Sequence, residues 1–280
     1  MLGTALQRVL TERGDRFMAP AESDFDITDE KAVALCVADF LEALRPGERG
    51  VLVNAAAYTN VERAEDDEAT AYRVNELGAR LLAEAARRTG LAFAHVSTDF
   101  VFDGTKVGAY AETDAANPLS VYGASKLAGE VAVLEADPRA LIVRTAWVFG
   151  PAGVNFPVKI LEAARKHPLL KVVTDEVGSP TYTLDLAVGI VGLVDAGATG
   201  LFHLAGAGSC SRFELAKQIL ELAGIDTPIE PVTADTFPTK AARPLNSELD
   251  CSKAALLGVT MPPWRDAVER FMRAAGELPA

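Results

Sequence analysis

The sequence predicts a mixed α/β fold: a doubly wound parallel sheet with helices on both faces, accompanied by a smaller C-terminal lobe. Short β-rich runs alternate with Ala/Leu/Glu/Arg-rich segments of helical period. The predicted strands are Val51–Asn54, Leu91–Ser97, Ala140–Arg144 and Leu201–Leu204, and the clearest helices are Glu68–Arg88 and Ser120–Glu135. Strands that alternate with helices pair in parallel, and their ligands bind beyond the carboxyl ends of the strands.

The beginning of the chain departs from this pattern. A helical stripe of apolar residues starts at Leu2, so the central first strand of such a sheet is missing, and only Gly3 remains of a glycine-rich turn. Phe17–Pro20 is predicted as the second strand. Either the protein lacks the first strand, or translation begins upstream of Met1. The second alternative is favoured, because a lost central strand leaves backbone groups of its neighbours unpaired, at about 1–3 kcal/mol each.

Proline and glycine turns mark the predicted lobe. The strand–helix alternation loosens after residue 150, with turns at Gly150-Pro151, Gly178-Ser-Pro180 and Met261-Pro-Pro263. Residues 1–150, rejoined by about residues 182–205, are predicted to form the sheet half. The remainder of residues 151–280 is predicted to form the lobe.

The charge and the apolar runs exclude several classes of partner. The formal net charge is −12 and no run of Lys or Arg offsets it, so nucleic acid and anionic membranes would be repelled. The longest apolar run, near Leu186–Val194, is far shorter than a membrane span. Arg8 and Glu12 interrupt any signal-peptide pattern. We expect a cytoplasmic protein.

Cysteine and histidine residues are few and scattered: Cys36, Cys210, Cys251, His95, His167 and His203. Their spacing fits neither a disulfide framework nor a zinc site. His95 and His203 occur in apolar stretches and are interpreted as core residues. No metal is therefore assigned.

The strongest catalytic pattern is Tyr122-Gly-Ala-Ser-Lys126. Residues four apart share one helix face, so the ammonium group can lie beside the phenol. A phenol has a pKa of about 10, and a nearby cation would lower it and make Tyr122 a proton donor for the reduction of a ketone. The spacing also fits an ordinary pair on a helix surface.

Hydroxyl and carboxyl groups follow one predicted strand. Ser97, Thr98 and Asp99 stand at its carboxyl end, where a hydroxyl group can bind the carbonyl oxygen that Tyr122 protonates. A capping or Asx-turn role is the alternative for Thr98 and Asp99. Because Tyr122 and Lys126 are also present, the catalytic interpretation of Thr98 and Asp99 is favoured over the structural one.

Several motifs together resemble the dTDP-4-dehydrorhamnose reductase family of extended short-chain dehydrogenases/reductases. They are Val53-Asn-Ala-Ala-Ala-Tyr-Thr59, Ser97-Thr-Asp-Phe-Val-Phe-Asp-Gly104, Tyr122-Gly-Ala-Ser-Lys126, Arg144-Thr-Ala-Trp-Val-Phe-Gly150 and Gly178-Ser-Pro-Thr-Tyr182. The resemblance covers nearly the whole chain. It implies a Rossmann-like domain, a substrate-binding C-terminal lobe, and reduction of dTDP-4-dehydro-L-rhamnose to dTDP-L-rhamnose by NADPH or NADH.

The resemblance also implies roles for individual positions. Tyr122 would donate the proton, Lys126 would hold the nicotinamide ribose, and Thr98 would bond the substrate carbonyl. The cofactor groove would be lined by Gly3, Asp26, Ile27, Ala55, Ala56, Ala57, Tyr58, Asn75, Tyr122 and Lys126. The sugar nucleotide would contact Thr98, Asp99, Trp147, Asn155 and Arg243. Arginine suits a pyrophosphate, whose oxygens accept its forked donors.

Some features leave alternatives open. The acidic stretch Glu62–Glu68 could bind Mg²⁺, which some members of the family use, but carboxylates also favour a helix N-terminus. Phe100 stands where the family more often has Tyr, and Ser209-Cys-Ser-Arg-Phe213 lacks a common Trp. A different dTDP-4-keto-deoxysugar, a non-catalytic cofactor-binding regulatory subunit on the same scaffold, and a homodimer also stay open.

Overall fold

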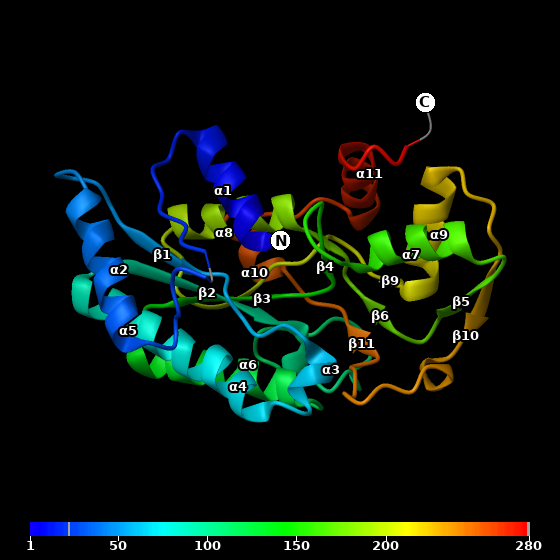
Figure 1. Cartoon of the computed structure of the whole chain (residues 1–280), viewed down its shortest axis with the longest axis horizontal. Coiled ribbons are helices and arrows are strands. Elements are labelled where there is room, and N and C mark those ends of the chain that lie inside the picture. Colours follow the sequence, from blue (N-terminus) through cyan, green and yellow to red (C-terminus); the bar gives the residue numbers. More distant parts are fainter. Residues whose placement is uncertain (22, 279–280) are drawn as a thin grey trace.

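A computed structural model describes residues 1–21 and 23–278 and has a parallel sheet at its centre (Figure 1). The strand order is β1-β2-β3-β8, and every neighbouring pair is parallel. The four strands are β1 (Val51–Asn54), β2 (Ala92–Thr98), β3 (Leu141–Thr145) and β8 (Gly200–His203). These agree with the predicted strands to within one or two residues.

Helices cover both faces of this sheet, as the doubly wound prediction requires (Figure 1). One face packs against α2 (Glu30–Ala43), α5 (Ala79–Thr89) and α6 (Val121–Ala136), and the other against α1 (Leu2–Arg13) and α8 (Thr183–Asp195). Successive residues of β3 divide between the two cores: Leu141 and Val143 face α1 and α8, whereas Ile142 faces α5. This period of two arises from the pleat of a strand buried on both faces. The α/β fold class is therefore confirmed.

The long predicted helix Glu68–Arg88 is divided into three consecutive segments. These are α4 (Glu68–Tyr72), a π-helical turn (Arg73–Gly78) and α5. The short helix α3 (Val61–Ala64) precedes them. A π-helical turn commonly occurs at functional sites, because the widened turn redirects a side chain. Here it carries Asn75, which is 1% exposed.

The prediction that Phe17–Pro20 forms a strand is wrong, because this segment has no regular secondary structure. A strand needs a neighbour to satisfy its backbone groups, and among the described residues β1 is the outermost strand of the sheet. Phe17 and Met18 are 38% and 45% exposed. Helix α1 instead packs directly on α8 through Ala5, Leu6 and Val9.

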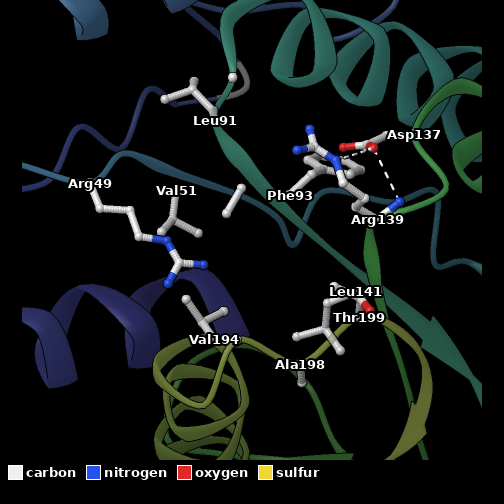
Figure 2. A pocket seen from close by; sticks show the side chains of 13 residues that line it. Arg49, Val51, Leu91, Phe93, Asp137, Arg139, Leu141, Val194, Ala198 and Thr199 are labelled. Atoms are coloured by element: carbon white, nitrogen blue, oxygen red, sulfur yellow. Dashed lines mark hydrogen bonds and ion pairs between the residues drawn. The ribbon is translucent and has the colours of Figure 1, made fainter.

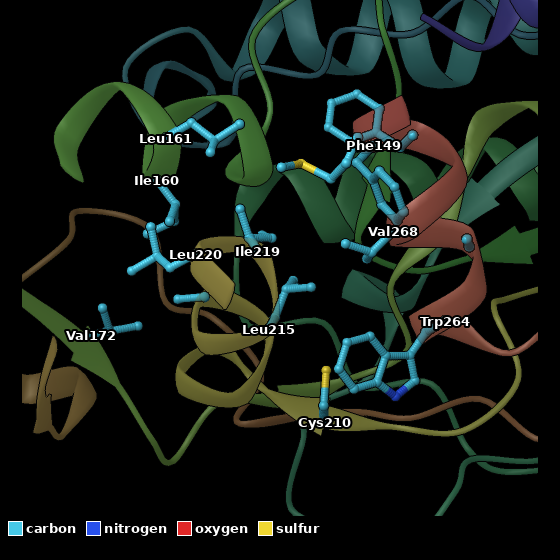
Figure 3. Packing of buried hydrophobic residues seen from close by; sticks show 14 of the residues in the cluster. Phe149, Ile160, Leu161, Val172, Cys210, Leu215, Ile219, Leu220, Trp264 and Val268 are labelled. Atoms are coloured by element: carbon cyan, nitrogen blue, oxygen red, sulfur yellow. The ribbon is translucent and has the colours of Figure 1, made fainter. Parts of the chain in front are cut away.

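The remaining segments surround a second apolar core (Figure 3). It involves helices α7 (Phe156–Lys166), α9 (Arg212–Ala223) and α11 (Trp264–Ala274). Three small sheets pair β4 (Val148–Phe149) with β7 (Thr181–Tyr182), β5 (Leu170–Val173) with β10 (Ile229–Val232), and β6 (Val177–Gly178) with both β9 (Cys210–Ser211) and β11 (Asn246–Ser247). We retain the division into residues 1–150 with 182–205 and a lobe within 151–280 as a proposal. Residues 279–280 lie outside the described part.

A short helix, α10 (Ser252–Ala255), lies next to β8. No helix in residues 1–21 and 23–278 combines the length and apolar character needed to cross a bilayer.

Candidate active site

Tyr122 and Thr98 meet at the carboxyl end of β2. Ser120 caps helix α6 by accepting a hydrogen bond from the Gly123 amide at 3.2 Å, which places Tyr122 in the first turn. Gly123 lets this turn approach the segment after β2, since a Cβ atom there would lie 2.2 Å from the Phe100 carbonyl oxygen. The resulting approach brings the Tyr122 phenol close enough to Thr98 for the threonine to influence its pKa.

Tyr122 is protonated at neutral pH. Burial raises the pKa of Tyr122 to about 12; the nearby Thr98 side chain opposes this shift and the Asp99 charge reinforces it. The predicted lowering of this pKa is not found in the structure, and stabilisation of the phenolate by Lys126 stays a prediction. A phenol that holds its proton can still donate it to a developing alkoxide, which is a stronger base.

Lys126 is buried one turn further along α6, with 2% of its surface exposed. Its Nζ donates to the Val96 carbonyl oxygen at 2.7 Å and lies 3.3 Å from Nε2 of His95. Burial lowers the pKa of Lys126 to about 8, although the Glu130 carboxylate opposes the shift. The lysine therefore contacts β2 in this structure.

Asp99 lies beside Thr98 and is 3% exposed. Its Oδ1 accepts a hydrogen bond from the Thr98 hydroxyl at 2.9 Å, and the nearby Ser247 side chain of β11 favours its ionised form. Burial raises its pKa against these hydrogen bonds. Its Oδ2 is buried without a hydrogen-bond partner among the described residues, so a polar group is directed into the site without being satisfied there.

A buried ion pair fixes α6 against the sheet behind these groups. Glu130 accepts two hydrogen bonds from Arg144 of β3, at 2.8 and 2.6 Å, and one from Ser97 at 2.5 Å. Both charged side chains are 5% exposed. Sequence reasoning did not identify this trio, since residues so far apart in the chain give no local signal.

The loop Ala55–Tyr58, predicted to line a cofactor groove, follows β1. Asn75 holds it from the π-helical turn: its Oδ1 accepts from the Tyr58 amide at 2.8 Å, and its Nδ2 donates to the Tyr58 carbonyl and to Ser125 Oγ. Asn75 thus connects the loop to α6, one residue from Lys126. Ala55 and Ala57 are half-buried and Ala56 is exposed, so small side chains leave the backbone accessible.

The first turn of α1 has the character of an anion site. Its N-cap residue, Met1, offers no side-chain hydrogen bond to the helix N–H groups, and nothing lies within 4 Å of a Cβ atom built on Gly3. A helix N-terminus with free N–H groups and open space suits a pyrophosphate. The donors and small residues at this edge therefore fit a dinucleotide.

Asp26 and Ile27 lie in the turn before α2. Asp26 is exposed, and its Oδ1 accepts from both the amide and the hydroxyl of Thr28, at 2.8 Å each. Ile27 is 9% exposed and packs against Gly78, where a Cβ atom would come within 2.7 Å of it. No contact among the described residues joins this pair to Tyr122 or Lys126.

Trp147, a predicted sugar contact, adopts a left-handed conformation, with φ of 45°. Its ring packs against Gly178, where a Cβ atom would come within 2.4 Å. The Arg212 guanidinium carbon lies 3.4 Å from the centre of the ring. Arg212 is also 3.3 Å from the Glu176 carboxylate, and the Asp99 charge acts on it. Sequence reasoning missed Arg212; the signal was the missing Trp in this segment.

Arg243 and the acidic stretch Glu62–Glu68 meet at the rim. Glu62 accepts a hydrogen bond from Arg243 Nη2 at 2.7 Å and another from the Lys240 amide at 2.9 Å. Asp66 pairs with Lys240, and Glu65 accepts from the Val121 amide. Glu62, Glu65 and Asp66 thus have protein partners, and residues 1–21 and 23–278 contain no group of three or more His, Cys, Asp or Glu side chains that could hold a metal ion.

Asn155 has a structural explanation in its contacts. It caps α7 by accepting from the Val158 amide at 3.3 Å, and its Nδ2 donates to the Gly150 carbonyl at 2.7 Å. The same nitrogen lies 3.7 Å from Met1 Sδ. It therefore borders the start of α1, and no described contact joins it to Tyr122 or Thr98.

A pocket at the opposite end of the sheet is separate from this site (Figure 2). Val51, Phe93 and Leu141 line it at the amino ends of β1, β2 and β3. Arg139 and Asp137 form an ion pair beside it at 3.4 Å. Parallel sheets carry their chemistry at the carboxyl ends, where Thr98 and the loop Ala55–Tyr58 follow β2 and β1.

Comparison with known proteins gives a consistent result. The family model described as RmlD substrate binding domain matches residues 1–276. A dTDP-4-dehydrorhamnose reductase of Mycobacterium tuberculosis is 41% identical, over 98% of this chain and 90% of its own length. A dTDP-4-keto-6-deoxy-D-glucose reductase of Streptomyces niveus is 39% identical, over 87% and 83% of the two chains.

The fold agrees as well. The crystal structure of dTDP-4-dehydrorhamnose reductase from Bacillus anthracis, in complex with NADP, superposes with a TM-score of 0.91 at 35% identity, covering 98% of this chain and 95% of that one. With the family model over nearly its whole length, the chain belongs to the RmlD substrate-binding-domain family, that of the dTDP-4-dehydrorhamnose reductases.

Proposed function

We propose that this chain is an oxidoreductase that reduces dTDP-4-dehydro-L-rhamnose to dTDP-L-rhamnose with NADPH or NADH. The observation that carries the proposal is the convergence of Thr98, at the carboxyl end of β2, and a protonated Tyr122, with Lys126 one turn along the same helix. A proton donor and a second hydroxyl group that converge on one point suit the oxygen of a ketone. Both the family and the NADP-bound relative support the assignment.

In this proposal, the residues of the chain manage the proton. When bound, NADPH or NADH would provide the hydride for the substrate carbon. Tyr122 donates its proton to the carbonyl oxygen, while the Thr98 hydroxyl bonds the same oxygen and stabilises the charge that develops there. The ammonium group of Lys126 stabilises the phenolate that Tyr122 becomes.

The cofactor is proposed to lie along the carboxyl edge of the sheet. Gly3 and the first turn of α1 would bind its pyrophosphate, the loop Ala55–Tyr58 with Asn75 would border its ribose and nicotinamide, and Lys126 would bond the ribose hydroxyls. Asp26 and Ile27 would border the adenosine end.

The sugar nucleotide is proposed to bind between Asp99, Trp147 and Arg243. The unpartnered Oδ2 of Asp99 can accept a hydrogen bond from a sugar hydroxyl group. Arg243 can bond a pyrophosphate oxygen through its fork of donors, and its Nε is buried without a partner among the described residues. Asn155 would act by capping α7 and supporting the adjacent rim.

A Tyr122→Phe variant tests the mechanism. We expect the reduction rate to fall by at least about 100-fold, because the proton donor is lost, while NADPH still binds, as followed by its fluorescence. A Tyr72→Phe variant, which changes a half-buried phenol on α4, should keep the parental rate. Reduction by Tyr122→Phe at the parental rate would refute the proposal.

Two alternatives have distinct signatures. The relative from Streptomyces niveus is named for a different dTDP-4-keto-deoxysugar, so competing keto-sugars ranked by kcat/KM decide the substrate. A non-catalytic cofactor-binding subunit would bind NADPH without oxidising it in the presence of any of them.

We further infer action in the cytoplasm and leave a homodimer as a proposal. The described cysteines Cys36, Cys210 and Cys251 are free thiols, which suits a reducing compartment. Sedimentation of the full chain would give the oligomeric state.

A further inference from the structure

We propose that His95, held in one tautomer by Asn54, is a positioning residue that disfavours the ammonium form of Lys126 and thereby sets the pH range over which this lysine works. The inference rests on the proposed function, in which Lys126 stabilises charge on Tyr122. His95 lies in the middle of β2 and is 0% exposed. The catalytic proposal itself makes no use of this imidazole.

The orientation of Asn54 is fixed by its own loop. At the end of β1, its Oδ1 accepts a hydrogen bond from the Ala56 amide at 3.0 Å. An amide oxygen that faces an N–H donor leaves the Nδ2 group for the other side. That Nδ2 lies 3.0 Å from Nδ1 of His95. Because Nδ2 can only donate, Nδ1 must accept and therefore carries no proton.

The protonation of the other ring nitrogen, Nε2, then determines whether His95 presents a hydrogen-bond donor or an acceptor to Lys126. Burial lowers the pKa of His95 well below its ordinary value, and the Lys126 charge lowers it further, so the imidazole is neutral. A neutral ring with an unprotonated Nδ1 carries its proton on Nε2, which lies 3.3 Å from Lys126 Nζ. An ammonium group opposite an N–H group makes a donor–donor contact, whereas an amine accepts the hydrogen bond. The contact therefore favours the amine.

The other ionisable groups around the pair oppose this effect or are neutral. From α6, the Glu130 charge raises the pKa of Lys126, but Glu130 is itself bound to Arg144 of β3. Tyr122 is protonated, and the Asp99 charge acts on Tyr122. Strand β1 and the π-helical turn place the side-chain amides of Asn54 and Asn75 near the pair, and these amides carry no charge. The imidazole is thus the group in direct contact whose tautomer can change the proton affinity of the lysine.

The tautomer can be measured directly on the full wild-type chain. ¹⁵N NMR of histidine-labelled protein distinguishes a protonated Nε2 from a protonated Nδ1, and the signals that vanish in a His95→Phe variant identify His95. We expect the proton on Nε2. A proton on Nδ1 would overturn the inference, and the tautomer is measured on the wild-type chain without reference to any activity.

The proton affinity of Lys126 is the second test. Titration of ¹³C-labelled lysine should show it rising by about threefold or more, half a pH unit, in His95→Phe. His203→Phe is the matched control: His203 is also 0% exposed, but its Nδ1 contacts the Tyr110 carbonyl oxygen at 3.1 Å, so Lys126 should titrate as in the wild type. An unchanged or lowered proton affinity in His95→Phe would contradict the inference.

Activity separates this inference from the proposed function. If the chain reduces the keto-sugar, the alkaline limit of kcat/KM should move upward with the Lys126 titration in His95→Phe. A limit that stays in place while Lys126 shifts would refute control of the working pH range by His95. A wild-type chain that reduces no keto-sugar would refute the proposed function, and the two NMR measurements would still decide the effect of His95 on Lys126.

Discussion

Arg212 lies over the ring of Trp147, with 3.4 Å between its guanidinium carbon and the ring centre, and is paired with Glu176 at 3.3 Å. The contact covers the strained Trp147 with a planar cation. The wall of the proposed sugar site is therefore charged in this chain.

Removing this cation should loosen the wall. Arg212→Leu forfeits the stacking on Trp147 and leaves Glu176 unpaired, with only 16% of its side chain exposed. We expect the free energy of unfolding to fall by about 2 kcal/mol, measured by urea denaturation. Glu176→Gln combined with Arg212→Leu should cost less than the sum of the single changes, because the two side chains interact. Additive effects would argue against the pair.

The pH dependence should follow Lys126. Its pKa of about 8 means that the ammonium group is lost well below the ordinary range of lysine, whereas Tyr122, with a pKa of about 12, stays protonated. We therefore expect kcat/KM to fall above about pH 8, measured between pH 6 and 10 with saturating cofactor. A plateau extending to pH 10 would show that Lys126 ionisation does not limit the reaction.

The same shift has a consequence for stability. Between the folded pKa of about 8 and the ordinary lysine value, the unfolded chain binds the Lys126 proton more tightly than the folded chain. The cost of burying the ammonium group is fully present below pH 8 and is relieved as the pH rises through that window. Lys126→Met should therefore flatten the rise of unfolding free energy in this range, compared with the wild type.

The Glu130–Arg144 pair should be essential to the fold. Glu130→Gln leaves the Arg144 cation, 4% exposed, without its carboxylate. We expect a loss of about 3 kcal/mol in the free energy of unfolding. Glu84→Gln is the control, because Glu84 pairs with Arg80 four residues away on the surface of α5 and its side chain is 30% exposed. That change should cost less than about 1 kcal/mol. Equal losses would contradict the analysis.

Gly129 sets the distance between α6 and the π-helical turn. A Cβ atom at this position would lie 2.1 Å from the Asn75 carbonyl oxygen. We expect Gly129→Ala to lower the free energy of unfolding by about 2 kcal/mol or more, because backbone must move. Gly3→Ala has no atom within 4 Å of the new methyl group, so thermal unfolding should show little change there.

Local patterns predicted much of this molecule from the sequence. The short β-rich run Ala140–Arg144 and the helix-face spacing of Tyr122 and Lys126 are properties of neighbouring residues, and the structure contains the predicted strand and helix. The strand prediction for Phe17–Pro20 was wrong because a strand requires a partner strand, which the residues of the segment do not specify.

Contacts between distant segments were beyond the same reasoning. His95 was interpreted as a core residue, and its burial agrees with this, but its contacts with Asn54 and Lys126 join β1, β2 and α6. The raised pKa of Tyr122 likewise depends on burial, which spacing along a helix does not report.

The contact between Glu62 and Arg243 makes the rim of the site responsive to ionic strength. Their side chains are 42% and 34% exposed, so dissolved ions can reach the pair, and the Debye length is about 8 Å at physiological salt. Concentrated salt would weaken the Glu62–Arg243 ion pair while leaving the buried Glu130–Arg144 pair nearly unaffected. The rim of the site can therefore become mobile under conditions in which the buried residues beneath it stay rigid.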